Sequence, residues 1–352
     1  MKSDNPFSLT FGMPPYKVIG RYEEKDKVIS AFQAENAVSH VFLIEGIRGS
    51  GKTVLMTSIS EVLCQSKDWV GVDLNSNMDL LENLAESLRD LVLRLPDIFE
   101  QGFNVSIGAA SVGIGGSGVK KSKVGEIEDI LKILKKRNKR LIITIDEVSA
   151  TQNMRVFASQ FQIFLRKKYP VFLIMTGLYQ NIYEIQNDET LTFLLRSPKL
   201  RLEALSLMQI AMQYEEIFKV DEEMATRMAR ETKGYAFAFQ ALGMLVWEKG
   251  TDALSSDEAG LFREYDSLLD DFAYKKIWSE LTKREQEIVL SVKDTEKTKV
   301  SEVCGNAGIS SSMFSQYKER LINKGVIVPA GYGYVELTLP RFNRVCRYYN
   351  AI

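Results

Sequence analysis

The first 205 residues alternate short apolar runs with longer polar or helix-forming segments. Each run is nearly continuous in aliphatic and β-branched residues instead of alternating between apolar and polar positions. Strands that are apolar on both sides are typical of a parallel sheet covered by helices on both faces. We therefore predict an α/β unit with strands over 40–46, 69–74, 140–146, 170–177 and 199–205.

One segment, residues 104–123, breaks this rhythm because it is rich in glycine and serine. Apolar side chains occur at alternate places within it, as at Val105 and Ile107. This pattern fits a hairpin or flap, and it equally fits a flexible linker. A phosphate-binding glycine loop is not predicted here, because no strong strand precedes it and no helix start follows at the required place.

The rest of the chain has a different pattern. Residues 206–270 look wholly helical, with Leu, Ala, Met and aromatic residues recurring at helical spacing. After that come shorter helices and a strand–turn–strand signal, over 281–292, 300–308, 310–325 and 326–340. This order is typical of a winged helix-turn-helix. We predict three units, at 1–205, 206–270 and 271–352.

Composition fits an ordinary globular protein, with 45% hydrophobic and 26% charged residues among 352. No apolar run approaches the roughly 20 residues that span a bilayer, so we expect a cytoplasmic protein without a signal peptide. The cysteines Cys64, Cys304 and Cys346 are expected to be reduced thiols, and His40 to be structural. Residues 275–352 carry 13 Lys and Arg against 8 Asp and Glu, a net of +5 that favours a polyanion-facing module.

The stretch 43-LIEGIRGSGKTVL-55 contains the pattern G-x-x-x-x-G-K-T between a strand signal and a helix signal. Its glycines let the backbone curl so that successive N–H groups point at phosphate oxygens. Lys52 then reaches the β- and γ-phosphates, and the Thr53 hydroxyl ligates Mg²⁺. The helix that follows directs its positive end at the same anion. We expect ATP to contact Gly46, Gly49, Ser50, Gly51, Lys52, Thr53 and Val54.

A second acidic signal supports this site. In 141-LIITIDEV-148 an unbroken apolar or β-branched run leads into Asp146 and Glu147. Asp146 is expected to hold the Mg²⁺ shell, and Glu147 to polarise a water for in-line attack on the γ-phosphate. Because many ATP-holding proteins lack the second acid, its presence favours hydrolysis over binding alone.

Two more residues are catalytic candidates. Thr176 places a hydroxyl where the strand over 170–177 is expected to end beside the phosphates. Arg196 is a candidate charge for the transition state, and a solvated arginine fits the sequence equally well.

These residues together resemble the origin-recognition-like AAA+ ATPases. The likeness covers nearly the whole chain, through 11-FGMPPYKVIGR-21, the glycine loop, IDEV, the strand ending near Thr176 and 231-ETKGYAFAFQALG-243. The sequence is more narrowly similar to bacterial signal-transducing P-loop ATPases that end in a winged helix. The resemblance implies that Thr176 is the sensor-1 residue and that 206–270 form a helical lid. It also implies that Arg196 is the arginine before the last core strand, and that the adenine lies near Ile19, Gly20 and Arg21.

The chain departs from the family at one position of the lid. Such lids often carry a sensor-2 arginine where this sequence has Phe237, and related ATPases often have a proline where it has Ala236. Lid closure therefore lacks its usual charged contact with nucleotide, which argues against a hexameric motor.

In a winged helix the second helix of the turn motif enters the major groove of DNA. Here that helix is expected over 310–324, with a core face of Met313, Phe314, Tyr317, Leu321 and Ile322. The side chains left for duplex DNA are Ser311, Ser312, Ser315, Gln316, Lys318 and Arg320, with further contacts from the turn over 330–334. Winged helices also serve as protein-docking or dimerisation modules, and that alternative stays open.

The sequence thus predicts a P-loop ATPase core with a parallel sheet, a helical lid and a C-terminal winged helix. The expected function is a slow, ATP-hydrolysing, Mg²⁺-dependent switch that controls a DNA-associated module. The alternative is a scaffold that retains ADP and uses the winged helix for protein contacts or self-association.

Overall fold

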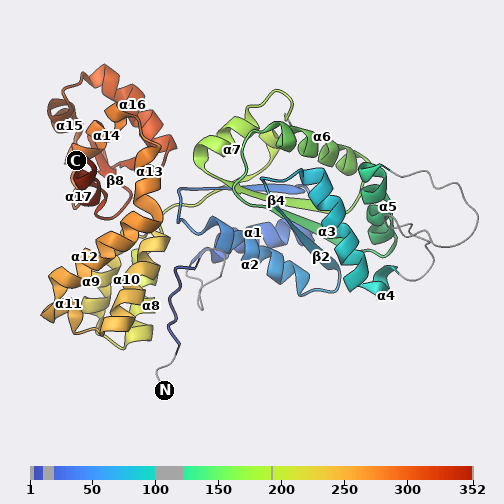
Figure 1. Ribbon diagram of the computed structural model, residues 1–352, viewed down its shortest axis with the longest axis horizontal. Helices are drawn as coiled ribbons and strands as arrows, with labels where there is room; N and C mark the ends of the chain where they lie inside the picture. Colours follow the sequence, from blue (N-terminus) through green and yellow to red (C-terminus); the bar gives the residue numbers. More distant parts are fainter. Residues whose placement is uncertain (1–3, 11–19, 100–121, 192, 351–352) are drawn as a thin grey trace, which may run out of the picture.

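The computed structural model describes residues 4–10, 20–99, 122–191 and 193–350. Figure 1 shows two lobes, an α/β core of residues 20–205 and a mainly helical lobe of residues 206–350. Ile19 and residues 104–121 of the predicted hairpin or linker lie outside the described residues.

Five parallel strands form the sheet of the core, in the order β2–β3–β4–β1–β5. Their bounds are β1 (Val41–Glu45), β2 (Trp69–Leu74), β3 (Arg140–Ile145), β4 (Val171–Gly177) and β5 (Lys199–Arg201). All five predicted strands are confirmed, and β5 is shorter than expected. Because β1 lies between β4 and the edge strand β5, the loop that follows it is flanked by the ends of strands on both sides.

Helices cover both faces of the sheet, as the apolar strands predict. Alternate residues of β1 divide between two cores, with Val41 and Leu43 on one face and Phe42 and Ile44 on the other. The first core packs against α3 (Leu80–Arg94), α5 (Lys123–Lys136), α6 (Gln152–Arg166) and α7 (Tyr179–Gln186). The second packs against α1 (Tyr22–Gln33) and α2 (Lys52–Cys64). Two short helices, α4 (Pro96–Phe99) and the 3-10 turn η1 (Leu194–Arg196), complete the core.

The histidine and the cysteines have structural places. The ring of His40 stacks on Phe172 with centroids 4.5 Å apart, and its Nδ1 lies 2.9 Å from the carbonyl oxygen of Val171. All three cysteines are free thiols, of which Cys304 and Cys346 are buried and Cys64 is exposed. None of the helices in the described ranges is both long and apolar enough to cross a membrane.

The second lobe begins with a bundle of helices. It contains α8 (Leu207–Phe218), α9 (Glu222–Thr232), α10 (Ala236–Lys249), α11 (Ala253–Ser256) and α12 (Glu258–Leu269). A π-helical turn, η2 (Asp270–Tyr274), then joins α12 to α13 (Lys275–Ser279) without a break. The predicted boundary after residue 270 therefore lies inside one continuous helix.

The last part of the chain has the element order of a winged helix. After α14 (Lys283–Leu290) come β6 (Thr298–Lys299), α15 (Val300–Ala307), α16 (Ser311–Asn323), β7 (Ile327–Pro329), β8 (Tyr334–Leu337), α17 (Phe342–Cys346) and η3 (Arg347–Asn350). The strands form an antiparallel sheet in the order β6–β8–β7. We call residues 275–350 the C-terminal module.

One prediction for this module is wrong. Met313 was expected in the core face of α16, but its side chain is 44% exposed. Phe314 and Leu321 are buried and lie seven positions apart on one side of the helix. Met313 is rotated by about 100° from that side, since each helical residue turns by this angle. It therefore lies among the exposed serines.

The bundle and the C-terminal module share one hydrophobic core. Tyr265 of α12, Tyr274 of η2 and Phe342 of α17 are all fully buried in it. Arg341 of the module forms an ion pair with Asp266 of α12, in which Nη2 and Oδ2 are 2.9 Å apart. Because a continuous helix, a common core and an ion pair join the two parts, we expect them to move together. We call residues 4–10 and 206–350 the lid–wing body.

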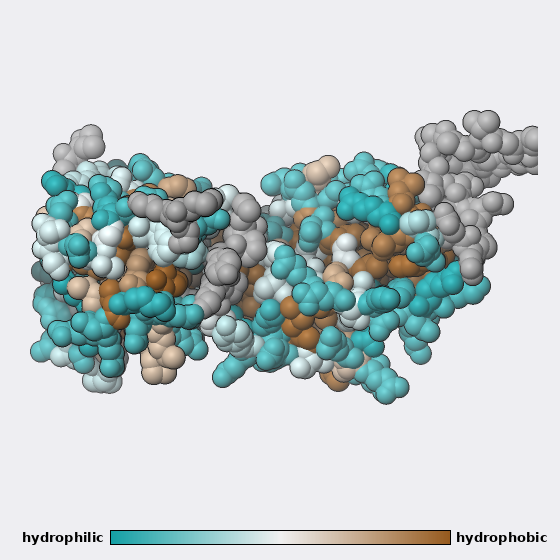
Figure 2. Space-filling model, turned by 90° about the horizontal axis from the view of Figure 1, so that it is seen from below, coloured by the Kyte–Doolittle hydropathy of each residue, from teal (hydrophilic) through white to brown (hydrophobic). Residues whose placement is uncertain are grey.

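Residues 4–10 belong to this body and not to the sheet domain. The Phe7 ring is buried against Phe239 of α10, with centroids 5.4 Å apart, and stacks on Phe218 of α8. Gly243 of α10 makes room for it, because a Cβ there would lie 2.2 Å from the Phe7 ring. Figure 2 shows the two lobes from below, with a mostly hydrophilic surface interrupted by apolar patches.

Candidate functional site

The glycine loop joins the buried strand β1 to helix α2. Gly49 and Gly51 have φ angles of 71° and 90°, in the left-handed region that favours glycine. Gly51 also caps α2, whose first residue is Lys52. The loop thus brings a helix N-terminus and a curled main chain to one edge of the sheet. This combination binds phosphate groups in P-loop proteins.

Lys52 is a buried amine at the start of α2, with 8% of its surface exposed. Its Nζ donates to the carbonyl oxygens of Gly46 and Ile47, at 3.1 and 2.8 Å. Burial lowers the pKa of Lys52 to about 8, against the opposing effect of the Asp146 and Glu147 carboxylates. The buried ammonium thus donates to two neutral carbonyl oxygens, and a bound phosphate would give it an anionic partner.

The acidic end of the site lies where β3 and β4 end side by side. Thr53 Oγ1 donates to Asp146 Oδ2 at 2.6 Å, and the fully buried Thr176 donates its hydroxyl proton to Asp146 Oδ1. The backbone N–H of Glu147 donates to Asp146 Oδ1 at 3.0 Å. Val148 N–H donates to the Thr176 carbonyl oxygen at 2.8 Å, which ties this turn to β4. Four of the predicted site residues are thus brought together, namely Thr53, Asp146, Glu147 and Thr176.

The donor set at this point fits Mg²⁺. Thr53 and Asp146 direct one hydroxyl and one carboxylate oxygen at each other. Mg²⁺ in nucleotide sites keeps several waters and takes one or two protein oxygens together with phosphate oxygens. No group of three or more His, Cys, Asp or Glu that could hold a metal occurs among the described residues. The hydroxyl of Thr53 and the carboxylate of Asp146 match this number of protein oxygens.

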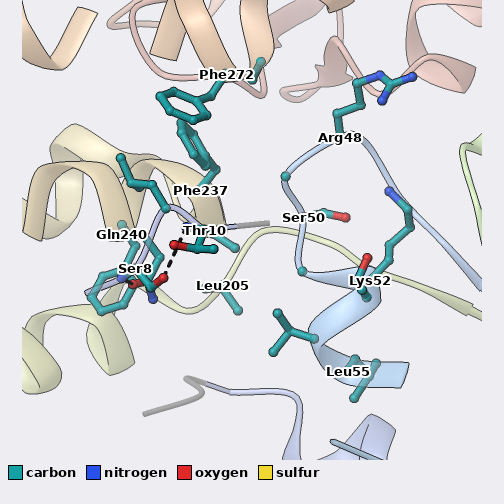
Figure 3. A pocket seen from close by; sticks show the side chains of 18 of the residues that line it. Ser8, Thr10, Arg48, Ser50, Lys52, Leu55, Leu205, Phe237, Gln240 and Phe272 are labelled. Carbon is teal, nitrogen blue, oxygen red and sulfur yellow. Dashed lines mark hydrogen bonds between the residues drawn. The ribbon is translucent and has the colours of Figure 1, made fainter. Parts of the chain in front are cut away.

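A cavity of about 440 Å³ opens beside the loop, between α2 and the lid helix α10 (Figure 3). Its lining includes the predicted residues Gly49, Ser50, Gly51, Lys52, Thr53, Val54, Arg21, Asp146 and Glu147. Gly46, Gly20, Thr176 and Arg196 are not in that lining. Gly46 and Thr176 instead support it, through the bonds to Lys52 and Asp146.

Several lining residues were missed from the sequence. In Figure 3, Ser8, Thr10 and Gln240 lie across the cavity from Lys52 and Leu55. Phe239 also lines the cavity. The Ser8 N–H donates to Gln240 Oε1 at 3.1 Å, which fixes the N-terminal segment on α10. The one sequence signal for these residues is the apolar Phe7 in the N-P-F stretch. Its burial against the lid helices places the next residue, Ser8, at the cavity.

The structure places the other predicted residues as follows. Arg21 has a left-handed φ of 66°, and its guanidinium donates to the backbone oxygen of Glu203. Gly20 lies beside Leu205 and Gln209 of the next cavity. Arg196 ends η1 with an exposed side chain and does not line the cavity. A transition-state role for Arg196 in the same chain therefore needs a rearrangement, whereas exposure leaves it open to another molecule.

The lid–wing body holds the glycine loop directly. Tyr235 Oη donates to the Arg48 carbonyl oxygen at 2.8 Å, and the Phe237 N–H donates to the Gly49 carbonyl oxygen at 3.0 Å. Gly325, at the end of α16, is so close that a Cβ there would lie 2.1 Å from Ile47 Cγ2. Phe237 thus meets the loop through its backbone.

The predicted DNA-facing side chains lie along one helix of the module. Ser311, Ser312, Ser315, Gln316 and Arg320 of α16 are exposed, and Lys318 is half-buried. The Arg320 guanidinium lies over the Tyr317 ring, 5.5 Å from its centroid. At the turn between β7 and β8, Tyr332 is fully exposed between Gly331 and Gly333.

Two solved structures match nearly the whole chain at low sequence identity. A Walker-type ATPase of Pyrococcus abyssi has a TM-score of 0.69 at 14% identity, with 97% of this chain and 99% of that chain covered. The ORC2 protein of Aeropyrum pernix, in ADPNP and ADP complexes, has a TM-score of 0.59 at 13% identity, with 97% and 98% covered. The chain has the fold of an origin-recognition-like AAA+ ATPase.

The sequence comparisons add one match. A domain of unknown function, DUF8462, matches residues 272–344. That range is nearly the C-terminal module together with the last turn of the π-helical link. No curated protein matches the sequence.

The lowered pKa of Lys52 predicts a pH-dependent nucleotide affinity. A phosphate favours the charged amine, so binding must restore its proton wherever Lys52 is neutral in the free protein. With a pKa of about 8, ATP affinity is expected to fall roughly tenfold between pH ~7.5 and ~9. Titrations of Lys52→Arg serve as the control and should show a flat profile over that interval. A flat profile in the wild type would contradict this role of Lys52.

Proposed function

We propose that the protein is an ATP-binding and ATP-hydrolysing switch whose nucleotide state controls a DNA-associated winged-helix module. This proposal rests on the direct contacts of the lid–wing body with the glycine loop, through Tyr235, Phe237 and Gly325. A ligand that reshapes the loop must disturb these contacts. The module shares its core with the lid, so that disturbance reaches the winged helix without a flexible joint.

The residues divide the expected chemistry between them. The loop N–H groups and Lys52 would hold the phosphates, and Thr53 with Asp146 would hold Mg²⁺. The metal ion would neutralise charge that develops on the β- and γ-phosphates. Glu147 would accept a proton from the attacking water. Thr176 donates a hydrogen bond to Asp146, and its Oγ1 accepts one from the Glu147 N–H at 3.3 Å, so it also positions the backbone of Glu147.

Nucleotide exchange would act on the module by moving the lid–wing body against the core. ATP in the cavity would meet the core through Lys52 and the lid through Ser8, Thr10 and Gln240. Closure on ATP and release after hydrolysis would therefore alternate two positions of the body. By linkage, a duplex that prefers one position must also favour one nucleotide.

The polar face of α16 supports duplex DNA as the partner. Its exposed serines and Gln316 can reach base edges or phosphates, while Lys318 and Arg320 supply charge. Because Lys318 and Arg320 would contact phosphates, we expect an affinity that depends on salt. The many serines on this face predict little discrimination between DNA sequences.

A titration of ATP turnover with duplex DNA at two salt concentrations tests this proposal. We expect duplex DNA to change the rate of ATP turnover. At the higher salt concentration, a higher concentration of duplex should be required for the same change. The paired change Lys318→Ala and Arg320→Ala should weaken the binding of duplex DNA. It should also lower the slope of log affinity against log salt concentration by roughly two units.

The control for that pair removes two exposed cations of the core, by Lys27→Ala with Lys136→Ala. It changes net charge equally and leaves the module intact. An equal loss of duplex affinity in both pairs would mean that α16 is not the DNA surface.

The second candidate is a nucleotide-gated scaffold, and Phe237 favours it. An apolar residue replaces the charged lid contact, so the lid can stay closed without sensing the γ-phosphate. Such a protein would retain ADP through purification, turn over ATP negligibly and bind a protein through the module. ADP released on denaturing the purified protein, together with no salt-sensitive duplex binding, would support the scaffold over the switch.

A further inference from the structure

The side chain of Arg48 connects the glycine loop to the C-terminal module. In Figure 3 it extends from the loop toward the ribbon of the module. Its Nη1 lies 3.5 Å from Glu147 Oε1, and its Nη2 lies 3.5 Å from Glu280 Oε1. Glu280 directly follows α13, at the start of the module. One guanidinium thus joins the expected general base to an element of the module.

The main chain around Arg48 is held by the lid. Tyr235 and Phe237 donate to the carbonyl oxygens of Arg48 and Gly49, so the loop cannot turn freely at this point. The Nε atom of Arg48 is buried and has no hydrogen-bond partner among the described residues. The two carboxylates therefore set the direction of the guanidinium, whose planar fork suits two acceptors.

The pair with Arg48 also bears on how Glu147 works. The backbone of Glu147 is fixed in a left-handed conformation, with a φ of 52°, and its side chain is 56% exposed. A general base needs a carboxylate oxygen directed at the water that it activates. Arg48 engages Oε1 instead, which draws the carboxylate toward the module.

We propose that Arg48 is a positioning residue that restrains Glu147, and that Glu280 holds Arg48 in the restraining position. Movement of the lid–wing body carries Glu280 away, frees the guanidinium to turn toward the phosphates, and releases Glu147 to its water. The inference rests on the proposed ATP hydrolysis. It also explains how the module reaches the site without a lid arginine at position 237.

Glu280→Gln tests the proposal, because it removes the charge that holds Arg48 and changes little else. Each exposed ion pair is a modest interaction, so we expect kcat to rise roughly threefold with KM unchanged. The matched control is Glu287→Gln in the same module, whose carboxylate pairs with Arg284 at 2.6 Å and does not contact the loop. The control should leave kcat at the wild-type value.

Lys276 also lies 3.6 Å from Glu280, so the source of any rise must be identified. Repeating Glu280→Gln in an Arg48→Ala background does this, since the restraint needs both residues. The rise should then vanish, as in a double-mutant cycle of coupled groups. A rise that persists without Arg48, or an unchanged kcat in Glu280→Gln, would overturn the inference.

The outcome for Glu147→Gln distinguishes a failure of the Arg48 restraint from a failure of ATP hydrolysis. If Glu147→Gln abolishes turnover while Glu280→Gln equals the wild type, the restraint is wrong and the hydrolytic site stands. If wild type, Glu147→Gln and Glu280→Gln all turn over ATP at the same negligible rate, hydrolysis and the restraint both fail.

Discussion

Glu147→Gln is expected to lower ATP turnover by roughly 10²- to 10⁴-fold while ATP still binds. Glutamine has nearly the same shape but cannot accept the proton of the attacking water. The groups that hold phosphate and metal, chiefly Lys52 and Thr53, are left in place. Steady-state phosphate release measures the loss, and binding of a fluorescent ATP analogue shows that affinity stays near the wild-type value.

The control for this change is Glu184→Gln on α7. Its carboxylate accepts a hydrogen bond from Gln180 on the protein surface and has no part in the cavity. Turnover in the control should match the wild type. Turnover in Glu147→Gln within twofold of wild type would mean that another group serves as the base.

Gly325→Ala is expected to weaken ATP binding roughly tenfold, because overpacking typically costs 1–3 kcal/mol and about 1.4 kcal/mol is a factor of ten. The new Cβ would lie 2.1 Å from Ile47 Cγ2 and 2.7 Å from the Tyr179 ring. The end of α16 must then move away from the glycine loop, and the contacts of Tyr235 and Phe237 with the loop are strained. Isothermal titration with ATP measures the change.

Backbone strain must be separated from this clash. Gly308→Ala is the matched control, because Gly308 has a φ of 61° against 70° for Gly325. Nothing lies within 4 Å of a Cβ at position 308. Both variants therefore lose a similar amount of unfolding free energy to the left-handed conformation, about 1 kcal/mol. Equal ATP affinities in Gly325→Ala and Gly308→Ala would show that packing of the module against the glycine loop does not affect ATP binding.

Much of the core could be predicted from sequence because its signals are local. A strand buried on both faces reads as a continuous apolar run, and the glycine loop needs residues of a fixed kind at a fixed spacing. Asp146 and Thr176 could also be foreseen, since the ends of parallel strands meet at one edge of a sheet. The hydrogen bond that the Thr176 hydroxyl donates to Asp146 follows from that placement.

The contacts between the lobes could not be predicted, because they join residues far apart in the chain. Nothing in the local pattern couples Arg48 to Glu280, or Phe7 to Gly243. The exposure of Met313 shows the same limit at smaller scale, since an apolar residue one position from a buried stripe fits either side of a helix. The roles of Arg196 and of the serines on α16 stay predictions, because they depend on molecules outside this chain.

The most direct test of the central claim is the affinity of duplex DNA in two nucleotide states. Glu147→Gln holds ATP without consuming it, so its dissociation constant for a duplex can be measured with ATP and again with ADP. Each nucleotide would fix a different position of the lid–wing body, and typical coupling between sites changes affinity roughly 5- to 150-fold. We predict a difference of at least about fivefold between the two states. Equal dissociation constants would contradict nucleotide control of the module.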